Sequence, residues 1–248
     1  MTEKRQPNLS DLFTAEFWAE FLAEAFSETF KTPIQNFKFN ILKAKALHAT
    51  AKEISHIFQK MIEKMPESET EIVFVLYYVY TEQALVSAVS ASEVYFKDIL
   101  AYTIQNDNRL LNRYLDKEIK VKRILDAGLN LSDNIGILIV ESMNFQSLDN
   151  VRDEYKRVLS FEPFTKEELK KLKEIFAIRH LIVHKSGIVD HMFISTTGLN
   201  YPVGKRLVFR RDEILQMIEF IDNIVNKIDS QLNPKPALEG EIFDSPQN

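Results

Sequence analysis

The chain has 248 residues, of which 45% are hydrophobic and 27% are charged, so it is long enough and apolar enough to bury a core of its own. It has no cysteine, which excludes disulfides and thiolate metal sites, and its net charge of -5 excludes a surface uniformly coated in positive charge for nucleic acid. The N-terminus lacks the apolar stretch of a secretory signal, and the longest apolar run, residues 72–80, is far shorter than a membrane span of about 20 residues. We therefore expect a cytoplasmic protein that does not enter a membrane.

Apolar residues recur at helical spacing along most of the chain, and only 6 glycines and 8 prolines are present to mark turns, so we predict an all-α fold with at most one short β-hairpin. In chain order, the predicted helices cover about 9–26, 36–65, 71–104, 108–128, 131–143 and 148–161. We expect residues 1–66 to form an N-terminal helical extension and residues 67–232 a helical domain. Residues 233–248, with three prolines and no apolar periodicity, are predicted to be a flexible tail.

The clearest helix start of the sequence is at Thr165, because Glu168 three residues later completes a capping box. Gly187 offers the C-terminal cap of this helix. The following residues, about 190–209, are rich in turn signals and contain the candidate hairpin, and residues 210–232 form a last amphipathic helix.

Arg179 is the most unusual residue of the helix that Thr165 starts. At about 100° per residue, Arg179 falls at the centre of an apolar stripe made of Leu172, Ile175, Phe176, Ile182 and Val183. A buried guanidinium must be paired or must face a polar cavity. One interpretation is structural: Arg179 clamps a carboxylate such as Glu93 on the central helix, and backbone groups satisfy His180 and His184. This interpretation explains the arginine but not the two histidines.

The spacing of His180 and His184 also suits two ligands of one divalent cation. However, Leu181 stands where a zinc protease has its glutamate, and Arg179 and Lys185 repel a cation. A metal-dependent hydrolase would need a carboxylate that reaches both rings. We therefore predict no metal and no cofactor.

The segment RHLIVH at 179–184 resembles the Arg-polar-x-x-x-His signature of the HEPN superfamily, small helical domains many of which are metal-independent endoribonucleases. SAVSASEVYFKDIL at 87–100 resembles the earlier helix of that family with its embedded acid, and FQSLDNVRDEYKRVL at 145–159 resembles the helix before the signature helix. The chain is most similar to the RiboL-PSP-HEPN group, over about residues 75–230. By position, Arg179 is the signature arginine, His184 the signature histidine and His180 the polar residue, which is Asn in many members.

The resemblance implies an endoribonuclease that acts on RNA through a composite site between the signature helices of two protomers. Metal-free cleavage needs proton transfer and stabilisation of a negatively charged phosphorane, for which His184 and Arg179 are suited. Five residues rotate these two side chains about 140° apart, so one helix cannot easily aim both, and the resemblance implies that a homodimer brings them together. The family also suggests a toxin or phage-defence role with an antitoxin or defence-system partner. The alternative is a non-catalytic HEPN scaffold that binds RNA, a nucleotide or a protein.

Basic residues around the signature are candidates for contacts with an RNA backbone. The candidate RNA-binding residues are Lys185, Lys205, Arg206, Arg210 and Arg211. The lysines at 166–173, in contrast, are balanced by Glu167, Glu168 and Glu174 and are interpreted as a solvated helix face.

Overall fold

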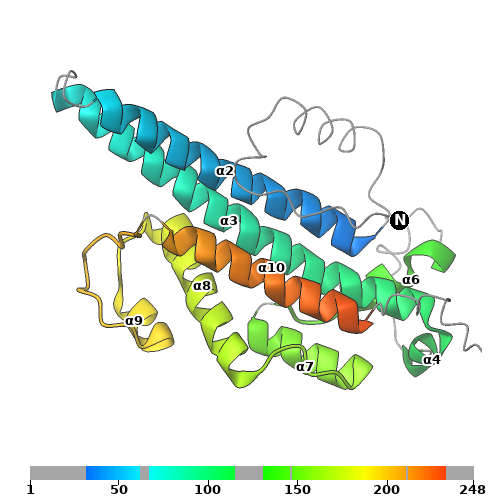
Figure 1. The fold of residues 1–248 in the computed structure, drawn as a ribbon. Coiled ribbons are helices and arrows are strands. Elements are labelled where there is room, and N and C mark those ends of the chain that lie inside the picture. The colour runs from blue at the N-terminus through cyan, green and yellow to red at the C-terminus, as the bar shows by residue number, and fades with distance from the viewer. Residues whose placement is uncertain (1–31, 62–66, 115–130, 146, 211, 233–248) are drawn as a thin grey trace, which may run out of the picture.

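The computed structural model describes residues 32–61, 67–114, 131–145, 147–210 and 212–232 (Figure 1). The elements in these ranges are α2 (Pro33–Met61), α3 (Glu67–Asn106), α4 (Asn108–Leu111), η3 (Asn112–Tyr114), α6 (Leu131–Val140), α7 (Leu148–Leu159), α8 (Lys166–Lys185), α9 (His191–Thr197) and α10 (Glu213–Leu232). The described ranges contain helices and no strand, which confirms the predicted all-α fold. None of these helices is long and apolar enough to cross a membrane. The helix predicted at 9–26, most of that predicted at 108–128 and the tail 233–248 lie outside the described residues.

The longest elements, α2 and α3, pack side by side as an antiparallel hairpin that extends beyond the other helices (Figure 1). Both bury small side chains without exposure, such as Ala44 on α2 and Ala88 on α3, and small residues let two helix axes approach closely. Phe37 and Ile41 of α2 belong to the same core cluster as the residues of α3. The assignment of residues 1–66 to a separate extension stays a prediction.

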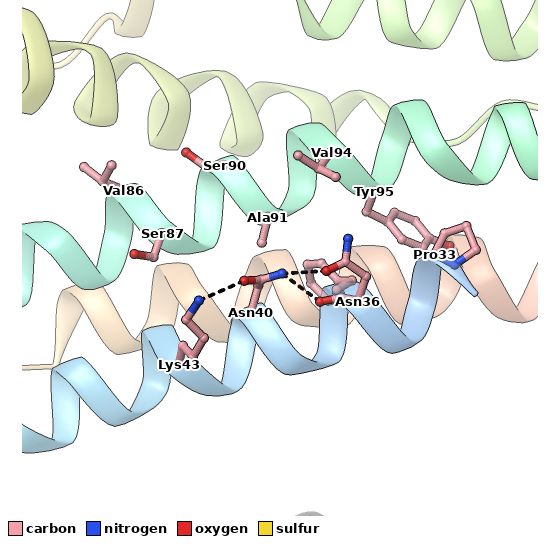
Figure 2. A pocket seen from close by; sticks show the side chains of 11 residues that line it. Pro33, Asn36, Asn40, Lys43, Val86, Ser87, Ser90, Ala91, Val94 and Tyr95 are labelled. Carbon is pink, nitrogen blue, oxygen red and sulfur yellow. Dashed lines mark hydrogen bonds between the residues drawn. The ribbon is translucent and has the colours of Figure 1, made fainter. Parts of the chain in front are cut away.

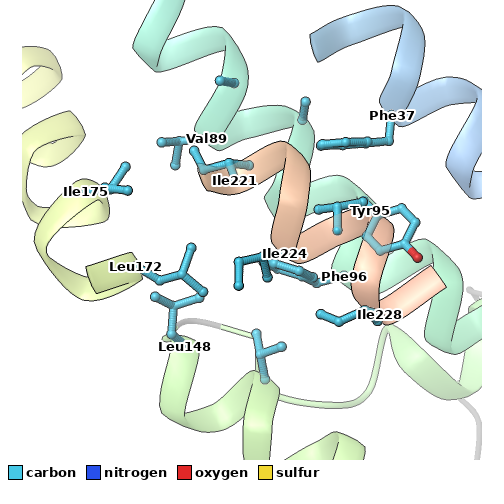
Figure 3. Close-up of a cluster of buried hydrophobic side chains, with 14 of the residues drawn as sticks. Phe37, Val89, Tyr95, Phe96, Leu148, Leu172, Ile175, Ile221, Ile224 and Ile228 are labelled. Carbon is cyan, nitrogen blue, oxygen red and sulfur yellow. The ribbon is translucent and has the colours of Figure 1, made fainter. Parts of the chain in front are cut away.

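The core lies where α8 and α10 meet α3 (Figure 3). Leu172 and Ile175 of α8 point toward Val89 of α3 and toward Ile221 and Ile224 of α10. All five are buried, and burying such a side chain stabilises the fold by about 1.5 to 3 kcal/mol relative to leaving it in water. The hydrophobic effect therefore fixes the position of α8 along α3.

Two buried polar groups connect the helices around this core. The Tyr155 hydroxyl on α7 donates to the Phe96 carbonyl on α3 at 2.7 Å, and burial raises the pKa of Tyr155 well above its usual value. On the other side, Lys45 of α2 pairs with the buried Asp222 of α10 at 2.5 Å, and Asn226 donates to the second Asp222 oxygen at 2.7 Å. Each buried group thus has a partner on a neighbouring helix or turn.

Both ends of α8 follow local capping rules. Thr165 Oγ1 accepts from the Glu168 amide at 3.2 Å, and the Glu168 carboxylate accepts from the Thr165 amide at 2.7 Å, which confirms the predicted capping box. The C-terminal cap is Ser186 at φ 50°, and Gly187 takes the next position at φ +74°. The prediction of Gly187 as the cap itself is therefore off by one residue, although both residues have the left-handed conformation.

The segment after α8 differs from the predicted turns and hairpin because it contains the helix α9. Asp190 Oδ1 caps α9 by accepting from the Phe193 amide at 2.8 Å, and Gly198 ends it at φ 70°. The candidate hairpin is reduced to one antiparallel bridge between Ile188 and Arg206. Two backbone hydrogen bonds support this bridge. The Leu207 amide donates to the Gly187 carbonyl at 2.8 Å, and the Val189 amide donates to the Lys205 carbonyl at 2.9 Å. The loop that carries α9 thus begins and ends at the C-terminus of α8.

Candidate functional site

The buried face of α8 is displaced from the predicted stripe. Its buried residues are spaced three apart and are Leu169, Leu172, Ile175, Ile178 and Leu181. Each step of three residues falls about 60° short of a full turn, so the buried line winds around the helix as α8 crosses its neighbours. The predicted stripe is right at Leu172 and Ile175 but wrong at Val183, whose side chain is 47% exposed. Arg179 therefore lies beside the buried face and not at its centre.

Arg179 pairs with Glu93 of α3, the partner that the structural interpretation named. The Arg179 Nη2 donates to Glu93 Oε2 at 3.4 Å, and the two side chains are 26% and 44% exposed. The bond is long for a charged pair, whose usual length is about 2.7 to 2.9 Å. Arg179 Nε is buried and has no hydrogen-bond acceptor among the described residues. The guanidinium is thus held weakly and has donors that the described residues do not use.

The histidines lie on the same two turns and are not core residues. Both His180 and His184 are exposed, and their ring centroids are 4.6 Å apart with the planes inclined by 44°. Their exposure argues against the part of the structural interpretation in which backbone groups satisfy the two histidines. The two imidazoles therefore lie one helical turn apart at the protein surface.

The predicted RNA-binding residues differ in how they are held. Arg206 donates to Glu82 of α3 at 2.7 Å, and the Glu82 side chain is only 12% exposed, so Arg206 is committed to the fold. Lys185 Nζ lies 3.9 Å from Asp190 Oδ2, so this surface ion pair is weaker than the pair of Arg206 with Glu82. Lys205 and Arg210 are exposed, and Arg211 lies outside the described residues.

Glu82 is the residue of this region that sequence reasoning missed. It lies eleven residues before Glu93 on α3, about three helical turns, so both carboxylates share one face and each pairs with one arginine. A side chain at Gly187 would contact Arg206 and Glu82 at 3.6 to 3.7 Å, which places this glycine against the second pair. One signal in the sequence could have identified Glu82. Glu82 and Glu93 are two carboxylates three turns apart on a face of α3 whose other side chains are small or apolar.

The geometry brings proton-transfer and anion-binding groups to one end of α8 but separates them around the helix. Arg179 turns toward α3, and the position of His184 is rotated about 140° from it. Among the described residues, no group of three or more histidine or acidic side chains is arranged to hold a metal ion.

Neither a scan against protein-family models nor searches of curated proteins and of solved structures return a match for this chain.

Proposed function

We propose that the protein is a HEPN-type endoribonuclease that cleaves RNA without a metal ion. One observation carries the proposal: two exposed imidazoles and a weakly held guanidinium lie within two turns of α8. These groups supply what the reaction needs, because imidazole transfers protons near neutral pH and guanidinium binds phosphate oxygens through a fixed fork of donors.

In the proposed reaction, His184 takes the proton of a ribose 2′-hydroxyl, and the resulting oxygen attacks the adjacent phosphorus. The bond from phosphorus to the 5′-oxygen breaks, and a second histidine, which starts as the protonated imidazolium, gives its proton to that leaving oxygen. Arg179 stabilises the negative charge that builds up on the phosphorane oxygens. The products are a 2′,3′-cyclic phosphate and a 5′-hydroxyl, so atoms and charge balance.

The weakness of the pair between Arg179 and Glu93 supports this role. A phosphate with several acceptor oxygens bonds a guanidinium more strongly than one carboxylate oxygen at 3.4 Å does. In the free protein, Glu93 thus holds Arg179 in place until the substrate takes over the guanidinium. Arg206, bonded at 2.7 Å to a nearly buried carboxylate, lacks that freedom.

The proposed site is composite, with two copies of the chain contributing to it. Arg179 and His184 of one chain point in different directions, whereas a two-fold axis near the end of α8 brings the arginine of one copy toward the histidine of the other. The exposed Val183 lies next to His184 and offers an apolar contact for such a homodimer. A cytoplasmic toxin or phage-defence role, with an antitoxin or defence-system partner, extends the proposal and rests only on the sequence resemblance over about residues 75–230.

The test is incubation of the purified full chain with single-stranded RNA, with and without a chelator. Chelator-resistant cleavage with cyclic phosphate ends is expected, and DNA should resist because it has no 2′-hydroxyl. Arg179→Ala and His184→Ala should each lose about 10²- to 10⁴-fold in rate, and His180→Ala should lose less. His191→Ala, an exposed histidine on α9, is the matched control and should cleave normally.

Three results would count against this function. Cleavage that requires added metal, or undiminished cleavage by both alanine variants, would reject the metal-independent mechanism. RNA that is bound but never cut would favour the non-catalytic scaffold. A monomer at micromolar concentration in light scattering would reject the composite site.

A further inference from the structure

The chain that returns from α9 toward α10 presents a backbone edge on the side away from the bridge between Ile188 and Arg206. The hydrogen bonds on either side of this bridge use the backbone groups of Lys205 and Leu207. Successive residues of an antiparallel pair point their backbone groups in opposite directions, so those of Arg206 and Val208 point outward. Neither of these two amides donates a hydrogen bond to a described residue. We refer to the backbone groups of Arg206 and Val208 as the outer edge.

Side-chain burial alternates along the same residues, as it does in a β-strand. Leu207 and Phe209 are buried in the core, whereas Arg206, Val208 and Arg210 are exposed, Val208 by 52%. The exposed face therefore carries an apolar side chain between two arginines, next to the outer edge. Such an edge is where an extended peptide can add as a further strand.

The surroundings of the outer edge are apolar for a protein surface. Half of the exposed large hydrophobic side chains of the described chain lie within residues 183–208. They are Val183, Ile188, Met192, Tyr201, Val203 and Val208. Such a group marks an interaction surface, and the loop that carries α9 lies at the periphery of the fold (Figure 1). Because only Tyr201 is aromatic, the surface suits the side chains of a protein better than stacked bases.

The same stretch is basic, although the net charge of the whole chain is -5. Residues 183–210 contain one acid, Asp190, and four bases, Lys185, Lys205, Arg206 and Arg210. Asp190 caps α9 and lies 3.9 Å from Lys185, and Arg206 pairs with Glu82. The side chains of Lys205 and Arg210 have no acidic partner in the described ranges. A partner that carries carboxylates complements this charge, whereas the same edge of a second copy would meet it with the same sign.

We propose that the outer edge binds an extended acidic peptide of a partner protein by strand addition. The peptide backbone exchanges hydrogen bonds with the outward amides and carbonyls of Arg206 and Val208. Alternate apolar side chains of the peptide contact Val208 and Ile188, and the acidic ones pair with Lys205 or Arg210, which flank the edge in sequence. An RNA strand supplies acceptors for the two amides but lacks the regular alternation of donors and acceptors that a strand edge presents.

The test is fluorescence anisotropy of a labelled synthetic peptide of about six residues, the length of an ordinary strand, added to the purified full chain. The peptide alternates glutamate with valine, and a control peptide has lysine in place of glutamate. Saturable binding is expected for the glutamate peptide, and binding at least about tenfold weaker for the lysine peptide. A glutamate peptide with methylated backbone amides cannot pair as a strand and should not bind.

Variants of the chain test the same contacts from the other side. Val208→Pro removes an outward amide and should weaken binding about tenfold, and a fold tolerates proline where the amide faces outward from an edge. Val208→Ala keeps the amide and should weaken binding less. Arg210→Glu should weaken binding about tenfold through charge repulsion. Lys43→Glu reverses an exposed lysine that donates to Asn40 in the groove between α2 and α3, so it is the matched control and should bind normally (Figure 2).

The outcomes separate the possible occupants of the outer edge. Absence of saturable binding by the folded chain, or equal binding of the methylated peptide, would overturn strand addition, and the methylated peptide keeps the test decisive if Val208→Pro does not fold. Binding of a 2′-O-methyl RNA oligonucleotide in place of the peptide, weakened by Arg210→Glu, would assign the surface to nucleic acid. A dimer in light scattering that Val208→Pro converts to a monomer would assign the edge to a second copy. His184→Ala should bind the peptide normally, so loss of cleavage and loss of peptide binding are observed separately.

Discussion

Replacing Arg179 with methionine should make the protein more stable while abolishing the proposed activity. Methionine keeps an unbranched apolar stem in the place of the arginine stem but removes the guanidinium. The change therefore separates the structural interpretation of Arg179 from the functional one.

The expected change in stability follows from two parts of the guanidinium, its ion pair with Glu93 and its buried Nε. The ion pair with Glu93 joins partly exposed groups at 3.4 Å, and such pairs contribute about 0 to 1 kcal/mol. The buried Nε has no acceptor among the described residues, and an unsatisfied buried donor costs about 1 to 3 kcal/mol. Glu93, left alone, is exposed enough to be hydrated. The net change expected is a stabilisation of about 1 kcal/mol.

Arg206→Met is the matched comparison because it removes the other arginine that pairs with α3. It leaves the Glu82 carboxylate, 12% exposed, without its partner, so a loss of about 1 to 3 kcal/mol is expected. Urea unfolding monitored by circular dichroism measures both changes, with unchanged slopes as evidence that the unfolding reaction is the same. If Arg179→Met is destabilised as much as Arg206→Met, Arg179 is a structural clamp and the functional argument fails.

Three further changes test the fold around the site. Tyr155→Phe removes the buried hydroxyl that donates to the Phe96 carbonyl, so the free energy of unfolding measured in urea titrations should fall by about 1 kcal/mol. An unchanged free energy of unfolding would show that this hydrogen bond makes no net contribution to stability. Burial opposes ionisation of Glu168, but hydrogen bonds from Lys227 and from the backbone amide of Thr165 outweigh burial and lower the pKa of this carboxyl group. The charged form of Glu168 therefore stabilises the fold at pH values above the pKa in the unfolded chain. This contribution is lost as the pH falls through the pKa in the folded protein. Glu168→Gln should thus cost about 1 kcal/mol near pH 7 and much less near pH 3, and a pH-independent difference would contradict this assignment. Gly187→Ala should lower stability by about 1 kcal/mol in thermal melts through its φ of +74° alone, since the added carbon meets its nearest neighbours at ordinary contact distances.

The sequence predicted the elements whose signals are local. The start of α8 is correct because the capping box involves only Thr165 and the three residues after it. The central helix was expected at about 71–104 and is Glu67–Asn106, because its apolar pattern is long and continuous. The partner of Arg179 was also predictable, since Glu93 is an acid embedded in a small, apolar stretch of that helix.

The errors concern short or distant features. The seven residues of α9 are too few to show helical periodicity, although Asp190 as N-cap and Gly198 as C-cap were readable signals. The pair of Arg206 with Glu82 joins residues 124 positions apart, which no local pattern reveals. The exposure of His180 and His184 depends on how the buried line winds around α8, and that winding is set by packing against α3 and α10.

The pairs that Glu82 and Glu93 make with their arginines also limit where residues can be inserted into or deleted from the chain. One residue inserted between Glu82 and Glu93 would turn one carboxylate about 100° away from its arginine while the other pair stayed in place. Substitutions between them are tolerated more readily than insertions, because a helix preserves register only when its length is preserved. The turn at Gly204 has no such constraint, since nothing lies within 4 Å of the position of an added Cβ. Evolutionary or engineered length variation should therefore be found in the loop after α9 and be absent from the three turns of α3 between the glutamates.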